Sequence, residues 1–132
     1  MIKNYLDINV YEAFLNRMEY IFQEFDNIYV SFSGGKDSGL LLNLILDYIR
    51  KNNIKKKIGL FHQDFEAQYS YTTQYISETF EKNLDLVEPY WVCLPMATRT
   101  ALSSYEMYWY PWDDNKRDLW VRKMPDKPYV KP

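Results

Sequence analysis

The chain has 132 residues, of which 47% are hydrophobic, and a net charge of −2. This length suffices for one domain with a hydrophobic core, and the composition excludes disordered and fibrous classes. The near-balanced charge gives no whole-chain attraction to nucleic acid or membranes, although a local basic patch stays open. The single cysteine excludes an internal disulfide, no apolar run approaches membrane-spanning length, and the first residues lack a signal-type apolar core, so we expect a cytoplasmic protein.

The first predicted element is a helix that begins after Asn9. Asn9 and Glu12 have the spacing of a capping box, in which each side chain binds the main chain of the other residue. Apolar residues then recur at intervals of three and four as far as Phe25. This period predicts an amphipathic helix that packs on a sheet and ends at Asp26 and Asn27.

A strand, a glycine-rich turn and a leucine-rich helix follow in that order. The run Ile28–Phe32 is almost continuously apolar, which is typical of a buried parallel strand, and residues 40–49 are rich in leucine. Between them lies the motif Ser-Gly-Gly-Lys-Asp-Ser at 33–38. Two glycines let the main chain approach a ligand, and the first N–H groups of the helix point outward at the positive end of its dipole. The order therefore predicts a pocket for a phosphate-type anion, to which Lys36 adds a full positive charge.

Residues 58–94 predict two further strands and one further helix. We expect a strand at 58–62, a helix at 69–82, and a strand from Leu84 to Leu94 that Pro89 interrupts. Each helix between two strands makes a crossover that is nearly always right-handed. The fold class is therefore a single α/β domain over 1–132, with an open, mostly parallel sheet flanked by helices.

Beyond Pro95 the pattern weakens. We expect a helix over residues 97–107 and an extended, loosely held stretch at 124–128. The segment 105–124 interleaves aromatic rings with cations, a composition that suits packing over the sheet, a protein interface or single-stranded nucleic acid. We favour packing or an interface, with a protein partner or a second copy of the chain.

The motif at 33–38 resembles the loop of the PP-loop pyrophosphatase superfamily. It is not a Walker A loop, because Val30 stands where that motif needs its first glycine and Asp37 where it needs Ser or Thr. The longer run 31–38 resembles the phosphoadenosine-phosphosulfate (PAPS) reductase-like branch. The phrases 109–112 and 119–125 resemble those of IbrA-type bacterial and phage proteins, a group described as co-activators of prophage gene expression. Those proteins are longer, so the resemblance covers their N-terminal nucleotide-binding part.

This resemblance implies an adenine-nucleotide alpha-hydrolase-like fold of about five parallel strands. Since three are readable here, the chain is a minimal or truncated version, or its other strands are irregular. The ligand implied is ATP or PAPS, with Mg²⁺. Its phosphate or sulfate groups would lie against Ser33, Gly34, Gly35, Lys36, Asp37 and Ser38.

Other residues have roles at the strand ends. The resemblance places adenine near Ser31, and it matches Asp64 to an acidic residue that binds a ribose hydroxyl or Mg²⁺; a turn or cap role is an equal alternative. Arg99 either reaches a phosphate or is a solvated helix residue, which we favour slightly. His62 is a weak candidate at the strand end, and Cys93 is expected to be a buried hydrophobe.

Two functions follow from the resemblance. In the first, the chain cleaves ATP between the α- and β-phosphates to adenylate an acceptor, with Lys36 and Asp37 as catalytic residues. In the second, it is a non-catalytic nucleotide-sensing module that acts with a protein or nucleic acid. Sulfonucleotide reduction is not expected, because the C-terminal Cys-Gly-x-His-type element of the reductases is absent from these 132 residues.

Overall fold

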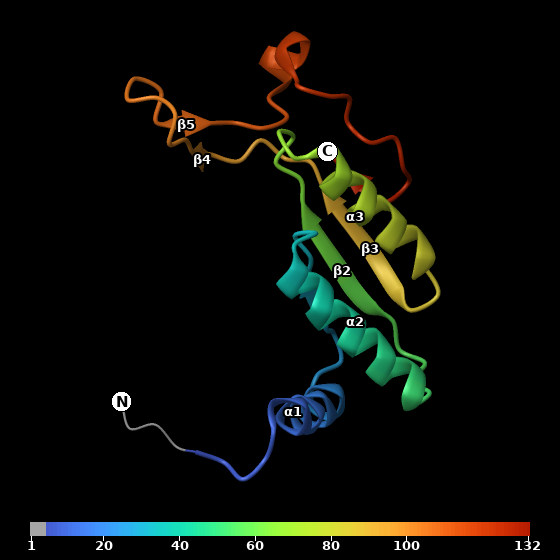
Figure 1. Ribbon diagram of the computed structural model, residues 1–132. Helices are drawn as coiled ribbons and strands as arrows, with labels where there is room; N and C mark the ends of the chain where they lie inside the picture. Colours follow the sequence, from blue (N-terminus) through green and yellow to red (C-terminus); the bar gives the residue numbers. More distant parts are fainter. Residues whose placement is uncertain (1–4) are drawn as a thin grey trace.

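The computed structural model describes residues 5–132 and has an α/β fold (Figure 1). The first four residues, on which the expected lack of a signal-type core partly rests, lie outside the described range. No helix in residues 5–132 is long and apolar enough to cross a membrane. The elements are α1 (Val10–Glu24), β1 (Tyr29–Ser31), α2 (Lys36–Lys51), β2 (Ile58–Gln63), α3 (Ser70–Lys82), β3 (Val87–Val92), β4 (Thr98–Arg99), β5 (Tyr108–Trp109), the 3₁₀ helix η1 (Asp114–Leu119) and β6 (Val130–Lys131).

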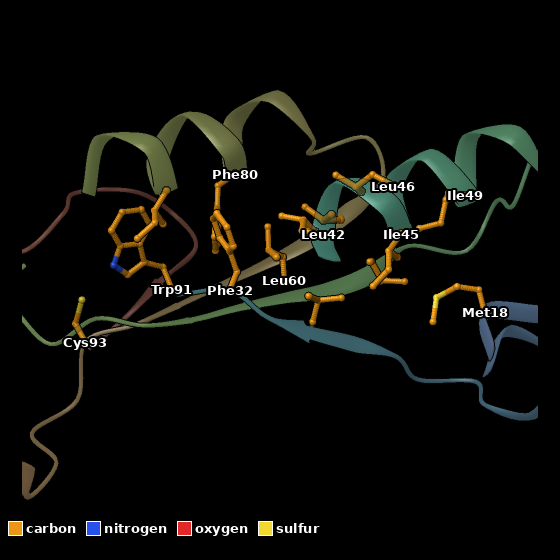
Figure 2. Close-up of a cluster of buried hydrophobic side chains, with 14 of the residues drawn as sticks. Met18, Phe32, Leu42, Ile45, Leu46, Ile49, Leu60, Phe80, Trp91 and Cys93 are labelled. Atoms are coloured by element: carbon orange, nitrogen blue, oxygen red, sulfur yellow. The ribbon is translucent and has the colours of Figure 1, made fainter. Parts of the chain in front are cut away.

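The main sheet has four strands in the order β1-β2-β3-β6, and all three pairings are parallel. Helices α2 and α3 lie on the same face of this sheet (Figures 1 and 2). The predicted α/β class with a mostly parallel sheet is therefore confirmed. The short strand β6 near the end of the chain was not predicted, since two residues carry no readable period.

The core lies between the sheet and helices α2 and α3 (Figure 2). Helix α1 begins at the predicted capping box, with both reciprocal hydrogen bonds present, and packs on α2 through a stack of Phe22 on Tyr48. The largest fully buried apolar side chains are Trp91, Phe32, Phe80, Leu42, Leu46, Ile49, Ile58, Leu60 and Ile76.

Pro89 does not interrupt the third strand, as we had expected. Strand β3 is continuous and pairs with β2 along its whole length. The N–H groups of Trp91 and Cys93 donate toward β6, at 3.3 and 2.8 Å, so alternate residues of β3 face that side. Pro89 lies two residues before Trp91 and faces the same way, where β6 does not yet reach. Its missing N–H therefore removes no ladder hydrogen bond.

The helix expected over 97–107 is wrong. Strands β4 and β5 form an antiparallel hairpin instead, with Thr98 opposite Trp109. Hydroxyl groups capture the main chain of its loop: Thr100 Oγ1 accepts the N–H of Leu102, and Ser103 Oγ accepts those of residues 105 and 106. Such local bonds compete with helix formation, and Thr, Tyr and Trp favour strands.

Candidate functional site

The loop at 33–38 joins the carboxyl end of β1 to the first turn of α2. Gly34 has φ +79°, and a Cβ atom there would lie 2.8 Å from Ile76 Cγ1 and 2.9 Å from Thr72 Cγ2. Glycine is required on both counts, because the left-handed conformation and the contact with α3 each exclude a side chain. The loop can therefore lie directly against α3.

Helix α2 begins without a side-chain cap from the described residues. Its N-cap is Gly35, whose φ of −78° is ordinary, and whose residue type offers no acceptor to the first-turn N–H groups. These donors remain free at the positive end of the helix dipole. Lys36 and Asp37 are both exposed in this first turn.

Two serines hold the loop in shape. Ser33 Oγ lies 3.0 Å from Ser38 Oγ and accepts the Gly35 N–H at 3.3 Å. The Ser38 hydroxyl donates to the Gly35 carbonyl at 3.1 Å. These bonds fix the turn before any ligand arrives, so the cost of ordering it on binding is reduced.

A hollow of about 660 Å³ opens beside the loop. This volume falls within the usual range for small-molecule sites. Of the predicted site residues, Ser33 lines it. Its other lining residues come from the loop before α3, from the first turn of α3 and from the C-terminal segment: Ala67, Gln68, Tyr69, Thr72 and Val121.

Asp64 follows β2 as predicted, but its carboxylate is occupied by protein donors. The side chain is fully buried, and Oδ2 accepts the indole N–H of Trp91 at 2.7 Å. Oδ1 accepts the Glu66 main-chain N–H at 2.8 Å and pairs with the Arg122 guanidinium at 2.5 Å. Both oxygens are thus used, so Asp64 does not fit the role of Mg²⁺ ligand or ribose acceptor in this conformation.

Glu66 is the second buried carboxylate at this strand end, and no sequence pattern singled it out. Its two oxygens accept the main-chain N–H groups of Trp112 and Val121, each at 2.9 Å. Its own carbonyl accepts Nε–H of Arg122 at 2.9 Å. The C-terminal segment is therefore tied to the carboxyl edge of β2 by charge-assisted hydrogen bonds.

Trp112 completes this cluster. It is buried, its indole N–H donates to the Asp64 carbonyl at 2.9 Å, and the Arg122 guanidinium lies 4.9 Å from its ring centre. The segment 105–124 is thus part cover and part exposed surface, since Tyr105 and Leu119 remain exposed.

His62, in β2, and Cys93, directly after β3, are both buried near Asp64. His62 Nδ1 lies 2.8 Å from the Phe32 carbonyl, and burial lowers the pKa of the imidazole although this bond opposes the shift. Burial, with a smaller effect from the Asp64 charge, raises the pKa of the Cys93 thiol to about 12. The expected burial of Cys93 is confirmed, and a thiol with this pKa is no nucleophile near neutral pH.

Arg99 lies on β4 and not on a helix. It lines a second hollow, of about 590 Å³, between the hairpin and the segment 116–121. The two hollows share Ala67 and Val121 as walls, so they are neighbours. Among the predicted residues, only the loop members 33–38 are brought together by the local fold; Ser31 is exposed at the end of β1.

Comparison with known proteins gives one relative of unassigned function. The chain is 38% identical over 128 residues to the uncharacterized protein YbdN of Escherichia coli strain K12. The match covers 96% of this chain and 30% of YbdN, so the chain spans less than a third of that relative's length. No family model and no solved structure matches the chain.

Proposed function

We propose that this chain is a PP-loop, PAPS reductase-like domain that binds an adenine nucleotide, ATP or PAPS, through residues 33–38. The observation that carries the proposal is the uncapped start of α2, which follows a turn where Gly34 admits no side chain and which opens beside a hollow. Free N–H groups, a helix dipole and the Lys36 charge together favour a polyphosphate or phosphosulfate.

The resemblance at 31–38 supports adenine as the base and its position near Ser31. Ser31 is exposed at the carboxyl end of β1, the edge where open α/β sheets bind ligands. The neutral, buried thiol of Cys93 agrees with a reducing cytoplasm, which we propose as the location.

Turnover of ATP would use the same loop. Lys36 and the first N–H groups of α2 would stabilise the negative charge that develops on departing pyrophosphate. Asp37 is exposed beside them and would hold the loop or approach the phosphates. Asp64 does not fit a metal ion here, since its oxygens are bound by Trp91, Arg122 and the Glu66 N–H.

The second candidate is a nucleotide-sensing module without turnover. The buried carboxylates favour it, because Asp64 and Glu66 are both engaged in holding the C-terminal segment. Nucleotide in the loop hollow would touch Val121 of that segment, and the exposed part of 105–124 would relay its presence to a protein or nucleic acid.

Calorimetry with ATP, AMP, PAPS and pyrophosphate tests the binding. Lys36→Ala should weaken ATP and pyrophosphate by about 10-fold or more, since a charge-assisted contact contributes roughly 1.5–3 kcal/mol. The control is Lys55→Ala, an exposed lysine just beyond the far end of α2. Equal affinity in the Lys36 variant and the parent would overturn the proposal, and pyrophosphate release from labelled ATP separates turnover from sensing.

A further inference from the structure

We propose that the hollow beside the β4–β5 hairpin, here called the hairpin hollow, binds a small aromatic carboxylate. The hairpin stands away from the main sheet (Figure 1). The hollow measures about 590 Å³ and is bounded by β4, β5 and residues 116–121. The proposal does not depend on nucleotide binding at the loop.

The walls of the hairpin hollow are largely apolar and aromatic. Leu102 has 97% of its surface exposed, and Leu119 and Val121 are also exposed. Trp109 is half-buried and Tyr108 exposed, and both residues line the hollow. Apolar walls with a few polar groups are the usual make-up of small-molecule sites, and a flat ring would cover this surface.

Two cations in the same walls lack a partner. Arg99 and Lys116 both line the hollow, and no carboxylate in residues 5–132 forms an ion pair with either. Glu66 at the base of the hollow forms no ion pair with either cation, since both its oxygens accept main-chain N–H groups. An unpaired guanidinium fork matches the two oxygens of a carboxylate.

The charge balance favours a monoanion over a phosphate. Glu66 and Glu106 line the hollow together with the two cations, so its formal charge sums to zero. A phosphate dianion would meet two carboxylates at this short range, whereas a single carboxylate between Arg99 and Lys116 meets its partners with less repulsion. The ring attached to it would lie against Trp109 and Leu102.

The test uses two probes of the same shape, indole-3-carboxylate and the uncharged indole-3-carboxamide, in calorimetry on the whole chain. The carboxylate should bind at least about 10-fold more tightly than the amide. The double variant R99Q/K116Q should lose this preference. The control K123Q removes an exposed cation that lines neither the hairpin hollow nor the loop hollow, and should keep it.

A second variant tests the apolar wall without endangering the fold. Leu102→Ser changes an almost fully exposed side chain and should weaken both probes equally. Equal affinity for the two probes, or no binding of either at about 10 mM, would overturn the proposal. ATP binding should be unchanged in the single variant K116Q, so failure here is distinguishable from failure at the loop.

Discussion

Replacing Arg122 by methionine should destabilise the protein far more than replacing Arg117, although both arginines contact an aspartate and a tryptophan. Each pairs with an aspartate, and each guanidinium lies over a tryptophan ring. The distance from the guanidinium carbon to the ring centre is 4.9 Å for Arg122 and 5.1 Å for Arg117. They differ in burial, and Arg122 also donates its Nε–H to the Glu66 carbonyl. The Arg122 and Asp64 side chains are 22% and 0% exposed, while Arg117 and Asp114 are 68% and 78% exposed.

The expected magnitudes follow from that difference. Removing one partner of a buried pair costs about 3–5 kcal/mol, because the other charge stays buried without compensation. Arg122 retains some exposure, so the lower end, about 3 kcal/mol, applies to Arg122→Met. The exposed pair at Arg117 is worth at most about 1 kcal/mol in water. A domain of this size has roughly 5–15 kcal/mol in total, so the first loss is a large part of its stability.

Urea unfolding followed by tryptophan fluorescence measures both variants. Methionine preserves much of the apolar stem of either arginine, so packing is matched. Arg122→Met should shift the midpoint strongly and Arg117→Met only slightly, with unchanged slopes. Equal midpoints for the two variants would refute the reasoning, because burial would then not decide the strength of the pair. The double variant with Asp64→Asn should recover part of the loss, since it removes the stranded charge.

Three further outcomes are expected. Gly34→Ala should cost about 2 kcal/mol or more in thermal unfolding, because of its positive φ and the contact with Ile76, while Gly35→Ala, with ordinary φ, should cost much less. Because the pKa of His62 is lowered in the folded protein, the unfolded chain takes up a proton at a higher pH than the folded chain does. The free energy of unfolding should therefore fall as the pH drops below about 6.5, and His62→Gln should make this dependence on pH weaker. With a pKa of about 12, Cys93 should react with iodoacetamide at pH 8 about a thousand-fold more slowly in the folded than in the urea-unfolded protein. If His62→Gln still lost stability steeply with falling pH, the lowered pKa of His62 would not be the cause. If the folded and unfolded proteins were alkylated at equal rates, the raised pKa of Cys93 would be contradicted.

Features set by short-range chemistry were predictable from the sequence. Asn9 and Glu12 are three residues apart, so their capping box is a local property, and the structure has it. The strand before Ser33 and the helix after it follow from hydrophobic runs of adequate length. The third strand was also visible, but the effect of Pro89 depends on which neighbour its nitrogen faces. That direction is set by β6, some forty residues later.

The roles of Asp64 and Glu66 could not be predicted for the same reason. Their partners in the C-terminal segment lie 46 to 58 residues away in sequence, and that segment has no regular period. The segment that contains Trp112 and Arg122 is rich in aromatic rings and cations, but this composition alone does not distinguish a buried ring from an exposed one. The one available signal was the presence of two acids directly after a buried strand together with two arginines, Arg117 and Arg122, in the aromatic segment.

The buried carboxylates also determine the shape of both hollows. Glu66 and Trp112 have φ of +63° and +58°, a conformation that costs roughly 1 kcal/mol or more per non-glycine residue and persists only where its surroundings hold it. Here the carboxylate of Glu66 holds it, by binding the N–H groups of Trp112 and Val121. Val121 is in turn a shared wall of the loop hollow and the hairpin hollow. Arg122 lines neither hollow, but its contacts with Asp64 and Glu66 support the carboxylate that holds Val121 in place. Loss of these Arg122 contacts should therefore loosen both sites at once.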